Sequence, residues 1–481
     1  MGRIAGFTLF GLGVVSALVM ALIAAVAVPV QLNGTSSRIT LKQVEAGESI
    51  TLTSMPAQPD NRWENDATTL FGQSRSVKYL MIRTADADMA IVAGLSSDQG
   101  PAPIMAVDPT DGKPLWDAPS PVLATWCAIS RDKKLACLRN DSNSASSTQV
   151  AFIDPADGSE LRTVTVTAPG SAKIQRAGNG FVVWTRKYDS DGNKSQASIA
   201  WVSSDGAKQW NRQPRIGQDD LTLSEAGNVV AVREDTKSAS VYQMDTGALL
   251  YDSTDDKFAF TEESDKKSRI GSVDVYMSAV PHAGGFAVSY RSIYQSVIKF
   301  YDSNGIHIKD IDDIQLPSYA DGTESAAVVF QREGKSSDYT TGVIRTTDHS
   351  VLWEDSAGFT YSTDVETVAG TFVVESDYEN DEKKWQVYKL ADGARLATFT
   401  TSIYQKIVGS DGERIVFDGD RTSDEPGPGA ITAYDSVTGK EVWRVKSTES
   451  ADDVNLRMVG PYLFWYNAST GTRQASLIRY G

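Results

Sequence analysis

The sequence predicts an all-β protein: a β-propeller of four-stranded blades that follows one N-terminal transmembrane helix. Three observations lead to this prediction. A turn motif recurs about every 47 residues, short apolar stretches of strand length precede its copies, and the N-terminus carries a long uncharged run. A repeat of this length is typical of propeller blades. Radial closure also removes most of the open edges that one linear sheet of this size would leave exposed.

The recurring motif is a β-hairpin whose turn combines aspartate with glycine. Its clearest copy reads ITAYDSVTGKEVW at residues 431–443. Seven related copies precede it, at residues 104–116, 150–162, 199–210, 241–251, 298–309, 342–353 and 385–397. Glycine supplies the positive φ that such a turn needs, and the aspartate side chain caps the turn backbone. His349 stands in the place of this glycine in the sixth copy.

An aromatic side chain recurs four positions after the turn glycine. Tryptophan takes this position in four copies, one of them counted from His349, and Tyr251 takes it in a fifth. An indole there can cover a neighbouring hairpin and donate its N–H to a backbone carbonyl. An ordinary core position is the alternative, but the constant spacing favours docking between blades. The residues to which we assign turn and docking roles are Asp108, Gly112, Trp116, Gly206, Trp210, Trp353, Asp435, Gly439 and Trp443.

The motif alone does not determine the number of blades. Each hairpin follows a further apolar run that suits an inner strand buried on both faces. Two strands, at residues 462–467 and 474–481, come after the last turn without an outer strand of their own. The segment 39–54 could supply it from the N-terminal side and close the ring. Taken literally, this arrangement has nine units; we expect eight, with one copy irregular or merged, and leave seven and nine open.

The N-terminus carries an apolar run, residues 4–30, without any charge between Arg3 and Arg38. Its 27 residues exceed the roughly 20 that span a bilayer and the roughly 7–15 of a cleavable signal peptide. We therefore predict one anchor, with the N-terminus in the cytoplasm because of Arg3. The alternative is a signal peptide cleaved after Ala27, since residues 25–27 have the small-x-small form. Both interpretations export the rest of the chain.

The anchor divides the chain into three parts. Residues 1–31 are the cytoplasmic N-terminus and the transmembrane anchor, residues 32–75 a juxtamembrane segment that could supply a closing strand, and residues 76–481 the propeller. No cysteine lies near the end of the anchor, which excludes lipid attachment there. No amphipathic helix is evident after it. We expect a single-pass protein of the cell membrane with its propeller outside the cytoplasm.

The chain has two cysteines, Cys127 and Cys137. The residues between them, AISRDKKLA, have a polar centre at 131–133 that is typical of a hairpin turn. The two thiols would then face each other across antiparallel strands, and an oxidising compartment would let them form a disulfide. Two reduced, buried cysteines are the alternative. We predict the disulfide, because the argument for export is independent of it.

The acidic composition limits the partners of the protein. The formal net charge is −16 and the isoelectric point about 4.8. An acidic surface repels phosphate backbones and anionic lipid, so we expect no nucleic-acid partner. We interpret two acidic stretches, residues 252–267 and 376–384, as solvated loops, with docking of a basic partner as the alternative.

The sequence offers little chemistry for catalysis. Its three histidines, His282, His307 and His349, stand at no metal-ligand spacing from one another, from cysteine or from carboxylates. We expect surface or turn roles for them. No nucleophile elbow of the Gly-x-Ser-x-Gly type occurs, and we assign no catalytic residue.

One loop has oxygen ligands at alternate positions, as calcium sites do: Asp189, Asp191 and Asn193. The sixth position of this loop is Lys194 rather than glycine, and the twelfth is Ala200 rather than glutamate. A polar hairpin tip is therefore the favoured interpretation, and these three residues are only a weak candidate for a metal site.

The motif resembles the repeat of pyrroloquinoline-quinone (PQQ) propellers, Ala-x-Asp-x-x-Thr-Gly-x-x-x-Trp. The match is complete at residues 433–443 and nearly complete at residues 106–116. The resemblance covers most of residues 76–481 and implies a propeller. It implies less about activity, because one fold carries many functions.

Two branches of this superfamily are relevant. The quinoprotein alcohol and glucose dehydrogenases carry a quinone and Ca²⁺ at the propeller centre, and in the alcohol dehydrogenases adjacent cysteines often cover the quinone. Here Cys127 and Cys137 are ten positions apart, and no Asp–Asn–Glu set aligns with the calcium ligands. The non-catalytic envelope propellers, such as BamB-like assembly factors, are closer in length and motif, although this chain has a predicted anchor and no lipidated cysteine.

We therefore expect a membrane-anchored propeller that binds envelope or extracellular proteins, or an envelope polymer, without catalysis and without a cofactor. A PQQ-dependent dehydrogenase that holds the quinone with calcium is the first alternative. A sensor that binds a ligand at the mouth of the central channel is the second. In all three cases the turn residues are architectural, and function belongs to the loops in which the copies differ.

Overall fold

The structure is a computed structural model that describes most of the chain from Ser54 to Tyr480. Within that span it leaves out residues 56, 58–60, 73–76, 97–100, 140–146, 168–170, 189–194, 215–220, 226, 234–238, 254–275, 292–295, 317–326, 334–338, 360–364, 369–370, 380–381, 390, 403–404, 419–429, 447–453, 460–461 and 468–474. The predicted anchor, its alternative cleavage site after Ala27 and residues 39–53 lie outside the described residues. Among the helices that are described, none has the length and apolar character to span a membrane.

The described residues form nine sheets, eight with four strands and one with three. Each sheet is one blade, and its strands pair in antiparallel order. Blade 1 contains β2 (Tyr79–Ala85), β3 (Ala90–Leu95), β4 (Ala102–Val107) and β5 (Leu123–Ala124). Blade 2 contains β6 (Cys127–Ile129), β7 (Leu135–Arg139), β8 (Thr148–Ile153) and β9 (Glu160–Val166). Blade 3 contains β10 (Ser171–Arg176), β11 (Gly180–Tyr188), β12 (Ser195–Ser203) and β13 (Gln209–Arg212).

The next five blades follow in chain order. Blade 4 contains β14 (Leu221–Ser224), β15 (Val229–Arg233), β16 (Ala239–Gln243) and β17 (Leu249–Asp252). Blade 5 contains β18 (Tyr276–His282), β19 (Gly285–Arg291), β20 (Ser296–Asp302) and β21 (His307–Asp312), and blade 6 contains β22 (Ala327–Glu333), β23 (Tyr339–Arg345) and β24 (Val351–Phe359). Blade 7 contains β25 (Val365–Val368), β26 (Thr371–Glu379), β27 (Glu382–Lys389) and β28 (Arg395–Ser402). Blade 8 contains β29 (Lys406–Ser410), β30 (Arg414–Asp418), β31 (Ala430–Asp435) and β32 (Glu441–Lys446).

Blade 9 combines the two ends of the described chain. Its strands are β33 (Val454–Val459), β34 (Tyr462–Asn467), β35 (Ser476–Tyr480) and, on the outside, β1 (Asn61–Asp66). β1 pairs antiparallel with β35, so that Asn61 lies opposite Tyr480 and Asp66 opposite Ser476. The outer strand thus comes from the N-terminal side of the chain, but from a position beyond the segment 39–54.

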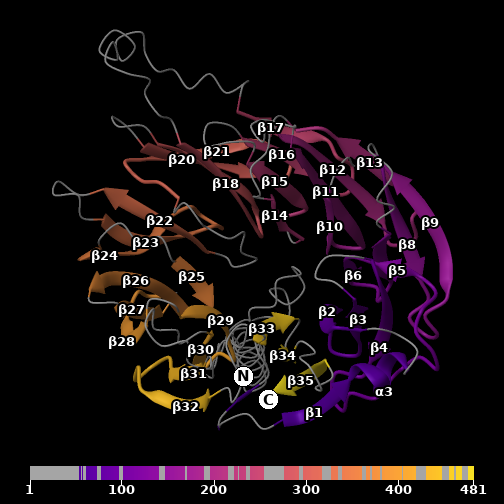
Figure 1. Cartoon of the computed structure of the whole chain (residues 1–481). Helices are drawn as coiled ribbons and strands as arrows, with labels where there is room; N and C mark the ends of the chain where they lie inside the picture. The colour runs from indigo at the N-terminus through magenta and orange to yellow at the C-terminus, as the bar shows by residue number, and fades with distance from the viewer. Residues whose placement is uncertain are drawn as a thin grey trace, which may run out of the picture.

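The blades form a ring in which the first strands, such as β2, β10 and β14, face the centre and the last strands form the rim (Figure 1). β2 contacts β6 in blade 2 and β33 in blade 9, which closes the circle between blades 9 and 1. An all-β propeller of four-stranded blades is therefore confirmed. The described residues form nine blades, a count that the sequence left open, rather than the preferred eight. The reason is that β33–β35 and β1 make a full blade instead of part of a merged one.

Blade 6 departs from the pattern. Its turn at His349 joins β23 and β24, so its three strands correspond to the second, third and fourth strands of the other blades. At the place of the first strand, Gln315 and Gln331 exchange two backbone hydrogen bonds of 2.8 and 2.7 Å as an isolated bridge.

One short helix, α3 (Ala67–Phe71), follows β1. Asp66 caps it by accepting the N–H of Thr69 at 2.6 Å, and Leu70 is buried. Five residues are too few to display the helical period from which a sequence pattern is recognised, which explains why no helix was expected here.

Burial follows the order of the strands within a blade. All six residues of β3 are buried, whereas β21 at the rim is almost entirely exposed. One expectation is wrong: within the stretch 376–384, interpreted as a solvated loop, residues 376–379 belong to β26 and residues 382–384 to β27. In the backbone register of this pair, Asp377 lies opposite Lys384.

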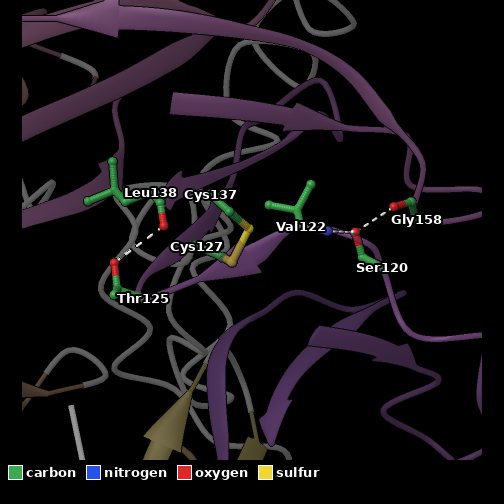
Figure 2. The surroundings of a disulfide bond; sticks show 7 residues. All are labelled: Ser120, Val122, Thr125, Cys127, Cys137, Leu138 and Gly158. Atoms are coloured by element: carbon green, nitrogen blue, oxygen red, sulfur yellow. Dashed lines mark hydrogen bonds between the residues drawn. A yellow bond between two sulfur atoms is a disulfide. The ribbon is translucent and has the colours of Figure 1, made fainter. Parts of the chain in front are cut away.

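The predicted disulfide between Cys127 and Cys137 is confirmed. The two residues are direct partners in the pairing of β6 with β7, and both are buried. Figure 2 shows the bridge between the two strands, beside the hydrogen bond that the Thr125 hydroxyl donates to the carbonyl of Leu138 at 3.3 Å. The turn at residues 131–133 brings the thiols together, as the spacing of the cysteines predicted.

Removing this disulfide should lower the free energy of unfolding by about 2–3 kcal/mol, because the unfolded chain would lose a cross-link across a short loop. The Cys127→Ala/Cys137→Ala double variant tests this in urea unfolding followed by circular dichroism. Reduction of the wild-type protein should give the same loss in the same experiment. A loss below about 0.5 kcal/mol by both routes would mean that the paired strands alone hold this hairpin.

Candidate functional site

One end of the ring carries the short hairpin turns, and we call this end the turn face. It consists of the turns between first and second strands and those between third and fourth strands. Backbone hydrogen bonds join the two kinds of turn within a blade: Ser436 donates to the carbonyl of Glu413 at 2.8 Å, and Met244 to that of Asn228 at 2.8 Å. The turn residues predicted from the repeat therefore lie together on one face of the propeller.

The aspartates of the motif hold the turn backbone. Asp435 accepts the N–H groups of Val437 and Thr438 at 3.1 and 2.7 Å and the hydroxyl of Thr438 at 2.9 Å. Asp108 accepts the N–H of Thr110 at 2.7 Å in the same way. Burial acts to raise the pKa of Asp435, but the hydrogen bonds from Thr438 and Val437 lower it overall. The turn glycines have positive φ, at Gly112 (76°), Gly206 (62°) and Gly439 (68°).

Tryptophans of the repeat lie on the turn of the following blade. The indole N–H of Trp116 donates to the carbonyl of Pro155 at 2.9 Å, and its ring covers Gly158 so closely that an added Cβ would lie 2.7 Å away. Trp210 donates to the carbonyl of Met244 at 2.9 Å and covers Gly247. Glycine is thus required in these turns for its backbone conformation and also for the space that the indole fills. The same close packing places Trp353 over Gly393.

Other side chains take the tryptophan position in the remaining copies. Arg162 stands there in blade 2, packs against Gly206 and lies over the ring of Phe152 at 4.9 Å. Lys309 stands there in blade 5 and donates to the carbonyl of His349 at 2.9 Å. A cation can thus replace the indole, because the turn of the next blade offers a carbonyl to either donor.

Closure of the ring uses the same contact with different partners. Trp443 donates to the carbonyl of Met55, at 3.1 Å, instead of to a repeat turn. The N–H of Met55 donates in turn to the carboxylate of Asp411 at 2.8 Å, and the buried Met55 side chain joins the core between blades 8 and 9. We call this arrangement of Met55, Asp411 and Trp443 the Met55 clasp.

Trp63 makes the last contact of the circle. It lies on β1, donates to the carbonyl of Pro109 at 3.0 Å and covers Gly112. Neither Trp63 nor the clasp residues Met55 and Asp411 were identified from the sequence. The one sequence feature that indicates this contact is the tryptophan in NRWEND. It does not match the repeat motif, because no turn glycine stands four positions before it.

Ion pairs also connect neighbouring turns. Lys133, in the first turn of blade 2, binds Asp86 at 2.8 Å and Asp88 at 2.9 Å in the first turn of blade 1. Partial burial acts to lower the pKa of Lys133, but its hydrogen bonds with these two carboxylates raise it overall. Between blades 3 and 4, Arg176 pairs with the buried Glu225 at 2.9 Å. Charged side chains of the turn face are thus used in part to hold the blades together.

The histidines depart from the expectation of surface positions. His307 is exposed on β21 and pairs with Asp310 at 2.6 Å. His349 belongs to a turn, as expected, whereas His282 is the last residue of β18, and both are buried. They come from different blades, and each ring lies near that of Phe300. The sequence could not indicate this proximity, because it depends on how blades 5 and 6 meet.

No group of three or more histidine, cysteine, aspartate or glutamate side chains suited to a metal ion occurs among the residues that the structure describes. The weak calcium candidate, Asp189 with Asp191 and Asn193, lies outside them. Within the described part of the chain, the acidic residues of the turns bind backbone N–H groups and cationic side chains.

Residues 36–470 match the family described as the conjugation-associated 9-bladed beta-propeller domain. The chain belongs to this family. Its stated blade number agrees with the nine sheets of the described residues. No curated protein matches the sequence significantly.

Solved propellers of varied function are similar in fold at low sequence identity. BamB from Moraxella catarrhalis is 12% identical, with a TM-score of 0.39 over 88% of this chain and 98% of that chain. The quinohemoprotein alcohol dehydrogenase from Comamonas testosteroni is 9% identical, with a TM-score of 0.40 over 91% of this chain and 79% of that chain. A eukaryotic initiation factor is 13% identical, with a TM-score of 0.44 over 85% and 96%. Similarity at this level bears on neither activity nor partner.

Proposed function

We propose that this chain is anchored in the cell membrane and works outside the cytoplasm as a non-catalytic scaffold that holds another envelope protein during conjugation. Membership of a conjugation-associated family supports the process. The apolar run at residues 4–30 supports the anchor, and the disulfide supports an oxidising compartment.

The observation that carries the proposal is that side chains of the repeat that could look catalytic have structural partners instead. Asp435 binds turn N–H groups, and Trp443 holds the backbone of Met55. These residues support the ring rather than act on a substrate. A rigid ring of repeated turns is suited to presenting a broad surface to another protein.

The charge of the turn face indicates the kind of partner. Hydrogen bonds from turn N–H groups and side chains lower the pKa values of Asp157, Asp205 and Asp392, so these exposed carboxylates stay ionised in mildly acidic solution. The whole chain carries a net charge of −16. We infer that the partner presents a basic surface to the turn face.

Affinity purification of the full chain from cross-linked membranes of mating cells tests the proposal. We expect a reproducible envelope partner whose recovery falls as salt is raised. The Asp157→Asn/Asp205→Asn/Asp392→Asn variant should reduce recovery several-fold, because asparagine keeps the turn cap but removes the charge. A matched variant, Glu64→Gln/Asp312→Asn/Glu382→Gln, makes the same change of charge on strands and should recover the partner normally.

Two results would contradict the scaffold. The first is the absence of any reproducible partner while the chain still sediments with membranes. The second is turnover of alcohols or sugars with a dye acceptor after PQQ and Ca²⁺ are added, which would support a dehydrogenase instead. The proposal assigns no resident cofactor, so we expect no turnover in this assay.

A further inference from the structure

Two of the three histidines of the chain meet in the interior, at the contact between blades 5 and 6. His282 ends β18 in blade 5, and His349 lies in the turn between β23 and β24 in blade 6. The ring of Phe300 lies near both, with centroid distances of 6.0 Å to His282 and 4.7 Å to His349. His282 is 1% exposed and His349 is 6% exposed. We call these three residues the histidine seam.

The hydrogen bond that the ring of His282 accepts favours its neutral form. Its Nδ1 accepts the N–H of Gly284 at 3.1 Å, so the neutral ring carries its proton on Nε2. Protonation would place a second hydrogen on Nδ1, facing the N–H of Gly284, and would break this bond. The Nε2 atom has no hydrogen-bond partner among the described residues, so a charge on the ring would gain no compensating contact there.

The backbone of His349 is held by hydrogen bonds on both sides. Its N–H donates to the carbonyl of Arg345 at 2.9 Å, and its carbonyl accepts the ammonium of Lys309 at 2.9 Å. Its Nε2 atom, like that of His282, has no hydrogen-bond partner in the described part of the chain. Its φ of 55° fills the left-handed position that glycine occupies in the other repeat turns.

The charged groups beside His349 act in opposite directions: Lys309 opposes a positive charge on its ring, and Asp348 favours one. Lys309 approaches from β21, and Asp348, the carboxylate next to His349, is exposed and already binds Arg345 at 2.8 Å. From blade 4, Gly227 packs on the carbonyl of His282, and the nearby Glu225 is paired with Arg176. Burial, and then the charge of His349, lower the pKa of His282 to about 4, although a hydrogen bond with the backbone of Phe286 acts to raise it. Burial, and then Lys309, lower the pKa of His349.

We propose that the histidine seam is an acid-sensitive joint: both rings are neutral when blades 5 and 6 are packed together, and their protonation loosens this contact. Histidine in an unfolded or opened chain has a pKa near 6.5, above the folded value of about 4 for His282. The opened state therefore binds more protons between these two values, and stability is lost as pH falls from about 6.5 towards 4. This inference is independent of the proposed function.

Other blades show which residues take the positions of His282 and His349 when no histidine is present. At the end of the first strand of blade 5, His282 accepts the N–H of Gly284. Serine takes this role in two other blades: Ser130 in blade 2 accepts the N–H of Lys134 at 3.0 Å, and Ser224 in blade 4 accepts the N–H of Gly227 at 2.9 Å. The turn position of His349 is glycine in the other copies. The substitutions His282→Ser and His349→Gly therefore replace each titrating ring by the residue that other blades use.

Urea unfolding at pH 7.5 and 5.0 tests the proposal on the full chain. In the wild type, protonation of His282 by itself should raise the equilibrium constant of unfolding about 30-fold as pH falls from 7.5 to 5.0. The His282→Ser/His349→Gly variant should show a much smaller rise. His307→Gln removes the exposed third histidine and should behave like the wild type.

Hydrogen exchange locates the change. Acidification should increase exchange of peptides covering 276–291 and 339–350 in the wild type, and much less in the double variant. If the double variant does not fold, the single variants are compared in the same two measurements. Equal losses of stability in wild type and histidine variants, or acid-induced exchange that spares these peptides, would overturn the proposal.

Discussion

Replacing Trp63 by alanine should lower the free energy of unfolding by about 3–5 kcal/mol, the range for removing a large buried aromatic side chain. Trp63 is 8% exposed, its N–H binds the carbonyl of Pro109, and its ring covers Gly112. It also packs near Phe464 inside blade 9, at 6.0 Å between ring centroids. The substitution would therefore weaken both blade 9 and the contact that closes the ring onto blade 1.

Two further variants separate these effects. Trp63→Phe keeps most of the ring but leaves the carbonyl of Pro109 without its donor, so a smaller loss of about 1–2 kcal/mol is expected. Trp210→Ala removes the same side chain from an internal contact between blades 3 and 4. Urea unfolding measures the three losses, and gel filtration of Trp63→Ala reports any association of opened rings. A loss below about 1 kcal/mol for Trp63→Ala would show that the ring is closed by other contacts.

The part of the fold that the sequence predicted is the part that each repeat determines locally. A turn such as that of Asp435 and Gly439 depends on residues a few positions apart, so its pattern is visible in the chain itself. The docking of Trp116 could be predicted from its constant offset, although its acceptor, Pro155, lies 39 positions away. Repetition supplied this information, because one contact recurs wherever the motif does.

Closure could not be predicted in the same way, because it joins the ends of the chain only once. Trp443 and Met55 are 388 positions apart, and no second copy of their contact exists in the repeat to reveal it. β1 has the sequence NRWEND, with charged and polar residues that do not alternate clearly with apolar ones. Its place at the rim of blade 9 depends on pairing with β35, which the repeat does not encode. For this reason the sequence pattern favours the segment 39–54 as the outer strand and eight blades over nine.

The candidate site depends even more on tertiary structure. His282 and His349 are each unremarkable in sequence, one at the end of a strand and one in a turn. Their common neighbour Phe300 belongs to a third element, and only the packing of blade 5 on blade 6 brings the three together. The absence of a catalytic motif limited the functions considered, but it could not indicate which surface meets a partner.

Asp411→Ala should be comparably destabilising, with an expected loss of about 3–5 kcal/mol, because it removes one partner of a buried ion pair. The carboxylate of Asp411 is 1% exposed and lies 3.0 Å from the guanidinium of Arg414, which is 13% exposed. It also accepts the N–H groups of Met55, Glu413 and Arg414 at 2.8, 3.0 and 2.7 Å. Alanine would leave Arg414 with less charge compensation and the N–H of Met55 without its acceptor.

Asp411→Asn keeps an oxygen acceptor and should cost less, about 1–3 kcal/mol, since hydrogen bonds to a charged group are stronger than those to a neutral one. Glu413→Gln is the matched control: Glu413 also binds Arg414, at 3.0 Å, but its side chain is 62% exposed, so its loss should stay below about 0.5 kcal/mol. Urea unfolding gives these losses, and limited proteolysis tests the clasp separately. If Asp411 holds Met55, cleavage near residues 54–57 should accelerate in Asp411→Ala but not in Glu413→Gln. If Asp411→Ala is destabilised but its cleavage rate is unchanged, Asp411 stabilises only its own turn, and Trp443 is the residue that holds Met55 in place.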